Sequence, residues 1–488
     1  MVGRYDKPGN SKELGIGLSR FFRFQGFIED GFERFPLKTF SKYLKGKNMK
    51  KLLVVMLCVS IFTLGLSAGD KKDVKKVDKV VKKAFSYYGK SGDDPFRPVP
   101  DGKLYPIVKK LKDLFEIKKV RDVYKKAIDN VKDFDGDGVI KPFENIWRNR
   151  TCDEFCYYFH HWLYFLATPE KEGLGFIEPF THFYYDNREA FYFLNTLEYN
   201  GEKVIFDWTV KFIETRGAFM DEKKNKEVLK AIDAWVTDPS THMEYYIVPA
   251  GGYKTFNEFF SRELKDGARP IADKGDDSVV VSPADSVINM LNTELTERSG
   301  IPLKVNKKIG VKALLNNHCS WKNFIGGTAL SCVLLPADYH HYHAPVTGTL
   351  VHYEEVNGIY NGIVDAPEWF HDGNVGASDA NFSIFELFHR GVFIFETKKF
   401  GYVAMVAVGL NTISRIEYEM KSVNTLEKYA KASKGNPVCV RKGTKLGGFK
   451  YGGSLNILLF EPGVFTGHSV HQGQRIGAMT EKPCKKKK

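Results

Sequence analysis

The sequence contains little cysteine, with seven residues in a chain of 488. Seven cysteines are too few for a disulfide scaffold, and Cys152 and Cys156 are followed by no His/Cys pair at zinc-binding spacing. Nucleic-acid-binding motifs are lacking too, so the formal net charge of +13 does not indicate a nucleic-acid partner. These absences argue against a disulfide-stapled module, a zinc module and a nucleic-acid binder.

The composition is that of a folded chain with a large core. Hydrophobic residues make up 43% and aromatic residues 14%, which predicts two or three domains. The excess lysine is concentrated in residues 71–83 and 482–488. Such runs form solvated tails, or they attract anionic lipid by about 1 kcal/mol per lysine near the surface. An anionic membrane surface is therefore one expected partner.

Residues 49–68 resemble a secretory signal. Met49 and two lysines precede an apolar stretch that ends in Ser-Ala, which predicts cleavage after Ala68. Met49 is then the expected initiator, and residues 1–48 a non-native or disordered extension. The alternative is a short membrane anchor, since about 17 apolar residues are the lower limit for spanning. Both interpretations predict an exported or membrane-associated protein, periplasmic or membrane-peripheral.

Residues 133–144 fit the twelve-residue loop of an EF-hand position by position. The loop has three carboxylates, a glycine at the sharp turn, a backbone carbonyl ligand and a final bidentate glutamate. It predicts a Ca²⁺ ion held by Asp133, Asp135, Asp137, Val139 and Glu144.

The pattern recurs 37 residues later in weaker form, since 138–147 and 175–184 share Gly-x-Ile-x-Pro-Phe. The second loop, 170–181, has lost two ligand positions to Leu174 and Thr181 and is expected to bind no calcium. We expect an EF-hand-like lobe over 105–200, entered by a helix over about 105–131 and bridged at Ile140 and Ile177. A basic linker (69–104) precedes this lobe, and a connecting helical segment (201–250) follows it.

From about residue 251 the pattern of residue types along the chain changes. Short Val/Ile/Leu/Tyr runs alternate with Gly- and Pro-rich turns, which indicates a β-rich fold. Residues 440–447 and 470–477 repeat an apolar–glycine–apolar pattern, as two equivalent hairpin corners would. The expected fold class is α+β, with a helical lobe followed by a sandwich-like or barrel-like domain over 251–488.

Three ordered segments in this domain carry the parts of an activated serine. Residues 282–285 read Ser-Pro-Ala-Asp, residues 338–345 read Asp-Tyr-His-His-Tyr-His-Ala-Pro, and residues 452–455 read Gly-Gly-Ser-Leu. If Ser454 attacks the carbonyl of Gly453, the ester formed can eliminate and leave a pyruvoyl group on the new N-terminus. A glycine at the scissile bond tolerates unusual backbone conformations.

With Phe-Asn-Glu-Phe-Phe-Ser-Arg-Glu-Leu at 256–264, Gly-Ala-Arg-Pro-Ile at 267–271 and Val-Thr-Gly-Thr at 346–349, these segments resemble the phosphatidylserine decarboxylase family. The resemblance covers roughly residues 250–480. It implies a pyruvoyl-dependent decarboxylase that converts phosphatidylserine to phosphatidylethanolamine. Plant members of that family also carry EF-hands, in agreement with the calcium loop.

The resemblance also implies roles for individual residues. Asp285 orients His343, which takes the proton of Ser454 as that residue attacks Gly453. The products are a β subunit that ends at Gly453 and an α subunit that begins with the pyruvoyl group, and the two stay associated. His340 is the expected acid that returns a proton to the substrate.

Two departures from the family pattern leave alternatives open. Leu455 stands where members carry a hydroxyl residue, which bears on the rate of cutting, and Ser286 stands where they carry glycine. One alternative is a decarboxylase of a free aromatic L-amino acid such as tryptophan. Another is a catalytically dead calcium-binding protein. The export signal, the basic runs and the calcium lobe favour the lipid substrate.

Overall fold

The computed structural model describes residues 94–136, 142–169, 176–223, 225–292, 295–297, 310–361, 385, 387–410, 416–418, 432, 435–465 and 467. All of them belong to one compact unit, Tyr87–Lys488. The predicted extension, the signal and most of the basic linker lie outside the described residues. In the ranges given, no helix has both the length and the apolar character needed to cross a membrane.

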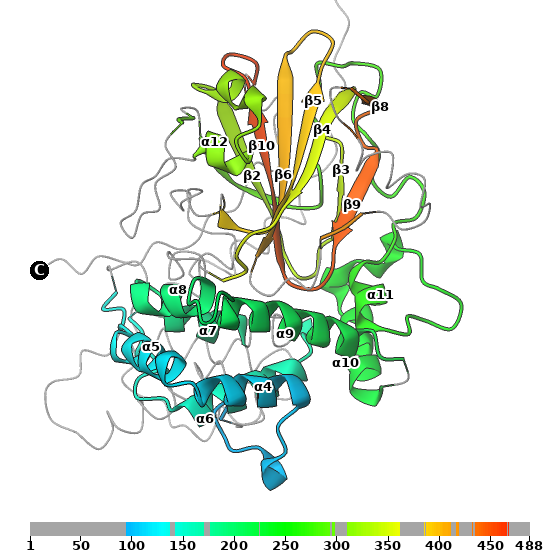
Figure 1. Cartoon of the computed structure of the whole chain (residues 1–488). Coiled ribbons are helices and arrows are strands. Elements are labelled where there is room, and N and C mark those ends of the chain that lie inside the picture. Colours follow the sequence, from blue (N-terminus) through cyan, green and yellow to red (C-terminus); the bar gives the residue numbers. More distant parts are fainter. Residues whose placement is uncertain are drawn as a thin grey trace, which may run out of the picture. The chain divides into compact units, whose positions relative to one another are not determined.

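The N-terminal part of the described chain is helical (Figure 1). Its α-helices are α4 (Pro106–Phe115), α5 (Lys118–Asp129), α6 (Cys152–Leu163), α7 (Ile177–Tyr184), α8 (Arg188–Asn195), α9 (Val204–Met220), α10 (Lys226–Val236) and α11 (Phe256–Phe260). Short 3₁₀ turns lie at Pro100–Gly102, Pro239–Thr241 and Met243–Tyr245.

The helix expected over about 105–131 is two helices, because the chain becomes extended at Ile117 (φ −74°, ψ 116°). Arg121 stabilises the break by donating from Nη1 to the carbonyl oxygens of Phe115 and Glu116, at 2.6 and 2.7 Å. These carbonyls end α4 and have no partner within that helix. A single side chain one turn into α5 thus caps α4.

The segment after Glu144 does not run directly into a helix. A turn follows it, and α6 starts at Cys152 behind a capping box formed by Thr151 and Glu154. In the second predicted loop, Ile177 is the first residue of α7. Its expected bridging partner, Ile140, lies outside the described residues.

Aromatic side chains form the core of the helical part. Trp147 is fully buried and donates from Nε1 to the carbonyl oxygen of Pro179 at 2.7 Å. Tyr158, Phe159 and Trp162 of α6 belong to the same core and are at most 3% exposed, whereas Tyr164, just beyond the helix, is 46% exposed.

The C-terminal part is built on two antiparallel sheets. The larger has the order β1-β2-β10-β6-β5-β4-β8 and the smaller the order β3-β9-β7. Figure 1 shows β2, β10, β6, β5 and β4 side by side. The strands are β1 (Val287–Asn292), β2 (Thr328–Leu334), β3 (His341–His343), β4 (Gly348–Val356), β5 (Arg390–Glu396), β6 (Tyr402–Leu410), β7 (Ile416–Tyr418), β8 (Val438–Val440), β9 (Lys445–Phe449) and β10 (Gly453–Phe460), with α12 (Val311–Leu314) and a 3₁₀ helix at Cys319–Phe324 between β1 and β2.

Strand β10 is buried on both faces. Leu455, Ile457 and Leu459 belong to one apolar cluster, while Leu458 and Phe460 belong to another on the opposite face. The two-residue period of an extended strand produces this alternation. A strand with both faces covered reads as a continuous apolar run, as residues 457–460 do.

The first copy of the sequence repeat makes the corner between β8 and β9. Gly443 has φ +80°, and a Cβ there would come within 2.5 Å of the Ile271 side chain. Only glycine meets both requirements without strain. The second copy, 470–477, lies outside the described residues.

The expected order of helices followed by a β-rich part is confirmed at the level of a mixed helix-and-sheet chain with a large antiparallel sheet. The EF-hand character of the helical lobe stays a prediction.

Candidate active site

Ser454 is the second residue of β10 and is 1% exposed. The ladder pairs it with Leu334 of β2 on one side and Gly409 of β6 on the other. Gly452, just before the strand, has φ +155°, which side-chain-bearing residues rarely adopt. The bond between Gly453 and Ser454 therefore lies at the start of a strand whose position is fixed from both sides.

The Ser454 hydroxyl meets the imidazole of His340, with Oγ 3.3 Å from Nδ1. The other ring nitrogen, Nε2, lies 3.1 Å from the carbonyl oxygen of Leu335. A carbonyl oxygen can only accept, so a neutral His340 carries its proton on Nε2. Nδ1 is then the acceptor, and the serine hydroxyl donates to it.

His340 lies in an apolar shell. Phe260 stacks on its ring with centroids 3.8 Å apart, and Tyr451 packs edge-on against Phe260 at 5.2 Å. Burial, and to a lesser degree the charge of Arg262, lower the pKa of His340 to about 3. The ring is neutral at physiological pH, where it accepts a hydrogen bond more readily than a proton.

His343 and Asp285 contact other groups. His343 Nδ1 lies 2.9 Å from the carbonyl oxygen of Gly443, and its Nε2 lies 3.2 Å from the Tyr339 hydroxyl. The Asp285 carboxylate pairs with Arg269 over N–O distances of 2.6 to 3.1 Å. The expected relay from Asp285 through His343 to the serine stays a prediction.

The spacing of the two histidines explains why one of them reaches the serine. Neighbouring side chains of an extended chain point to opposite sides, so His340 and His343, three positions apart, face away from each other. The backbone still connects His343 to the aspartate segment, because its N–H donates to the carbonyl oxygen of Pro283 at 2.7 Å.

Charged side chains lie near His340, beside the aromatic rings that pack against it. Burial raises the pKa of Asp338 to about 6, and nearby Asp285 acts in the same direction. Arg262 is 1% exposed, lies over the Tyr246 ring at 4.1 Å and donates to the carbonyl oxygen of Ala337. Its Nε and Nη1 have no acceptor among the described residues.

Sequence reasoning gave Arg262, Asp338 and Phe260 no individual role, although all three lie in the quoted motifs. Their position within those motifs is the sequence feature that could have identified them as site residues. Tyr451, beside the cleavage glycines, carried no such signal.

The two unusual residues near the site have separate surroundings. Leu455 is fully buried in the cluster on the face opposite Ser454, together with Ile457. A hydroxyl at position 455 would not lie on the side of the strand where His340 contacts the serine. Ser286 lies 3.4 Å from the Ser282 hydroxyl.

The calcium loop is described at its two ends only, because Asp137 and Val139 lie outside the described residues. The Asp133 carboxylate accepts from the Asn145 backbone N–H and pairs with Arg148, both at 2.8 Å. In the part of the chain that the structure describes, no three His, Cys, Asp or Glu side chains are grouped for a metal. Asp135 and Glu144 lie at the described ends of the loop, and the Asp133 carboxylate is paired with the Arg148 cation.

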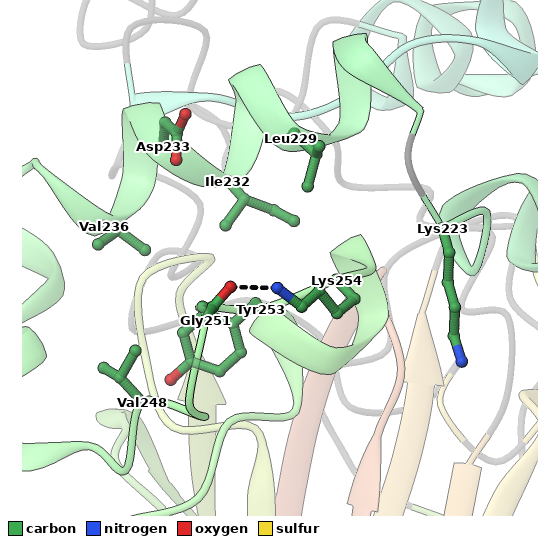
Figure 2. Close-up of a pocket in the computed structure, with 10 residues that line it drawn as sticks. Lys223, Leu229, Ile232, Asp233, Val236, Val248, Gly251, Tyr253 and Lys254 are labelled. Carbon is green, nitrogen blue, oxygen red and sulfur yellow. Dashed lines mark hydrogen bonds between the residues drawn. The ribbon is translucent and has the colours of Figure 1, made fainter.

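A cavity of about 570 Å³ lies between α10 and residues 248–254. Figure 2 shows Leu229, Ile232 and Val236 of α10 on one side and Val248 and Tyr253 on the other. Lys223 and Lys254 also line it, and Lys254 Nζ donates to the carbonyl oxygen of Gly251.

The cavity adjoins an exposed apolar segment. Ile247 and Val248 are 51% and 49% exposed, and Tyr245 is 40% exposed. Tyr246, between them, is buried beneath Arg262. One segment thus presents apolar side chains to solvent and contributes Tyr246 to the charged group around His340.

Known proteins match the C-terminal part of the chain. Residues 256–478 match the model of the family described as phosphatidylserine decarboxylase. The phosphatidylserine decarboxylase proenzyme of Fusobacterium nucleatum is 31% identical over 259 residues, which are 53% of this chain and 74% of the relative. That of Vibrio vulnificus is 32% identical over 233 residues, 46% of this chain and 75% of the relative. Proenzyme 3 of Schizosaccharomyces pombe is 31% identical over 236 residues, 48% of this chain and 22% of that longer relative.

The neutrality of His340 predicts how stability depends on pH. A histidine whose pKa folding lowers from about 6.5 to about 3 takes up its proton preferentially in the unfolded chain. Its contribution is complete above pH 6.5 and is lost as the pH falls toward 3. Between pH 6.5 and 5 the expected loss from His340 is about 2 kcal/mol.

The measurement is urea unfolding at both pH values, with and without His340→Gln, in chains that also carry Ser454→Ala. The His340→Gln chain should lose less stability on acidification by about the amount stated. Equal losses in the two chains would contradict the buried neutral imidazole. His341 and Asp338 are retained in both chains, so their contributions cancel.

Proposed function

Because the chain belongs to the phosphatidylserine decarboxylase family, we propose that it cuts itself between Gly453 and Ser454 and then converts phosphatidylserine to phosphatidylethanolamine. The family is one of carboxy-lyases. The observation that carries the proposal is the buried Ser454 hydroxyl, 3.3 Å from an imidazole nitrogen and next to a glycine carbonyl at the start of β10.

In the proposed cut, Ser454 Oγ attacks the carbonyl carbon of Gly453 and the peptide bond becomes an ester. Loss of the Cα proton of residue 454 then breaks the Cβ–O bond, which leaves a carboxylate on Gly453. Water releases ammonia from residue 454, which becomes the pyruvoyl group. The products are the β and α subunits, and we propose that they stay associated.

We assign His343 as the base and Asp285 as its orienting carboxylate. His340 suits the removal of the serine proton less well, because its low pKa disfavours the imidazolium. It instead fixes the hydroxyl by accepting a hydrogen bond. Asp285 must turn from Arg269 toward His343 for the relay to form.

The pyruvoyl group supplies a carbonyl that withdraws electrons from the bond to the departing carboxylate. The residues around position 454 fit such a group, since they are buried and the site keeps water away from the reacting atoms. We assign His340 as the acid that returns a proton to the substrate, because its Nδ1 lies beside residue 454 and a proton taken up at a ring of low pKa is readily given away.

A lipid substrate is supported by the charges and by the neighbouring surface. Two N–H groups of the buried Arg262 have no acceptor among the described residues, which suits an anionic headgroup. The exposed Ile247 and Val248 and the apolar cavity beside them suit contact with a bilayer. We place the anionic membrane surface at this segment.

Three variants test the cut. Ser454→Ala should leave one intact chain, because no hydroxyl remains to attack. His343→Asn should also stay uncut. His340→Asn should still cut, about fivefold more slowly, since it loses one hydrogen bond of roughly 1 kcal/mol.

The measurement is the fraction of the small C-terminal fragment on a denaturing gel over time. An uncut His340→Asn chain beside a His343→Asn chain that cuts at the original rate would reverse the two roles. An intact original chain would instead support the catalytically dead alternative.

The substrate is tested with carboxyl-labelled phosphatidylserine in vesicles and with carboxyl-labelled tryptophan. The cut protein should release labelled carbon dioxide from the lipid, whereas Ser454→Ala should release none. The reason is that only the lipid carries the apolar part that the exposed segment fits. Faster release from tryptophan would establish the free-amino-acid alternative.

We also propose that residues 133–144 bind calcium, on the strength of their twelve-residue pattern. Calcium would have to displace Arg148 from the Asp133 carboxylate. Millimolar calcium should therefore raise the melting temperature of the original chain and of the control Asp129→Asn, while Glu144→Gln should show no rise. A rise of equal size in all three chains, or in none, would contradict calcium binding by residues 133–144.

A further inference from the structure

Arg216 of α9 is a buried cation that the reaction described so far does not use. Its side chain is 2% exposed. Nη1 donates to the carbonyl oxygens of Trp162, Leu163 and Phe165, at 2.6, 3.3 and 2.9 Å. These carbonyls form the C-terminal end of α6, where a cation is favoured by the helix dipole.

The rest of the guanidinium has no anionic partner in the part of the chain that the structure describes. Nε and Nη2 find no hydrogen-bond acceptor among the described residues. Burial lowers the pKa of Arg216 to about 10, and Tyr451 opposes this effect only in part. The partners of Arg216 are three carbonyl oxygens and the Tyr451 side chain, none of them a carboxylate. A buried cation without an anionic partner carries a large desolvation cost, which an anion brought to Nε and Nη2 would offset.

The neighbouring chain segment leads directly to the cleavage bond. The guanidinium carbon lies 5.4 Å from the ring centroid of Tyr451. Lys450, the preceding residue, reaches Asp221 just beyond α9, with Nζ 3.8 Å from Oδ2. Gly453 follows Tyr451 by two residues, which span at most about 7 Å when extended, and it is paired with Leu410 of β6. Gly453 can approach Arg216 only if this tail leaves the sheet edge after the cut.

We propose that Arg216 binds the carboxylate that self-cutting creates on Gly453. This inference rests on the proposed cut. When the Cβ–O bond of the Ser454 ester breaks, its electron pair goes to the Gly453 carboxylate, and the Cα proton of residue 454 is taken up by a base. The chain thus produces an anion within reach of Arg216, and the planar guanidinium can hold a carboxylate through two parallel hydrogen bonds.

Binding at Arg216 has a consequence for the new active site. The end of the β subunit would be drawn toward α9 and away from residue 454, leaving room for substrate. Residues 94–255, outside the family match, would then contribute a residue to the cut enzyme.

The experiment follows the Gly453 carboxylate itself. Protein labelled with [1-¹³C]glycine contains 44 glycines, and cutting turns one of their peptide carbonyls into a carboxylate with its own NMR signal. Its pKa should lie at least one unit below the usual C-terminal value of about 3.3. In Arg216→Met the pKa should return to about that value, and in Arg216→Lys it should lie between the two.

The control is Asn187→Ala, which removes another buried side chain from the helical part. Asn187 donates to the carbonyl oxygens of Ala127 and Phe183, far in sequence from the cut. It should leave the titration unchanged. If Arg216→Met does not fold, Arg216→Lys decides alone, because it loses the second parallel hydrogen bond.

A Gly453 carboxylate that titrates alike in the original chain and in the Arg216 variants would overturn the proposal. Absence of any new carboxylate signal, with one intact chain by mass, would overturn the cut on which it rests. The two failures are therefore distinguishable.

Discussion

The site depends on the double pairing of β10. Ladders to β2 and β6 hold the strand from its first residues, and apolar clusters cover both of its faces. Because the backbone cannot shift without breaking both ladders, Ser454 is held where its hydroxyl meets Nδ1 of His340. A nucleophile that attacks its own backbone carbonyl needs such a constraint, since a freely extended chain keeps the two atoms apart.

Burial determines the electrostatics around that serine. The apolar shell of Phe260 and Tyr451 keeps His340 neutral. Burial also raises the pKa of Asp338, to about 6. Arg262 and Arg269 supply the positive charge of the site. The region therefore combines the neutral imidazole of His340 with two arginines and with the carboxylates of Asp285 and Asp338.

Much of this arrangement could be predicted from the sequence, because ordered motifs place Ser454, His340, His343 and Asp285 in one domain. Strand periodicity, applied to the odd spacing of the two histidines, would also have indicated that one alone faces the serine. The break at Ile117 could not be predicted, since it depends on a cap from Arg121. Arg216 could not be connected to Tyr451 either, because 235 positions separate them and no periodicity spans such a distance.

The sheet order also bears on the lifetime of the molecule. Both neighbours of β10 precede the scissile bond in the chain, so the small fragment would supply a middle strand of a sheet whose other described strands all belong to the large fragment. It could not leave or be exchanged for a fresh copy without unfolding the whole domain. Each molecule would make its keto group once, and chemical damage to that group could be repaired only by new synthesis of the entire chain.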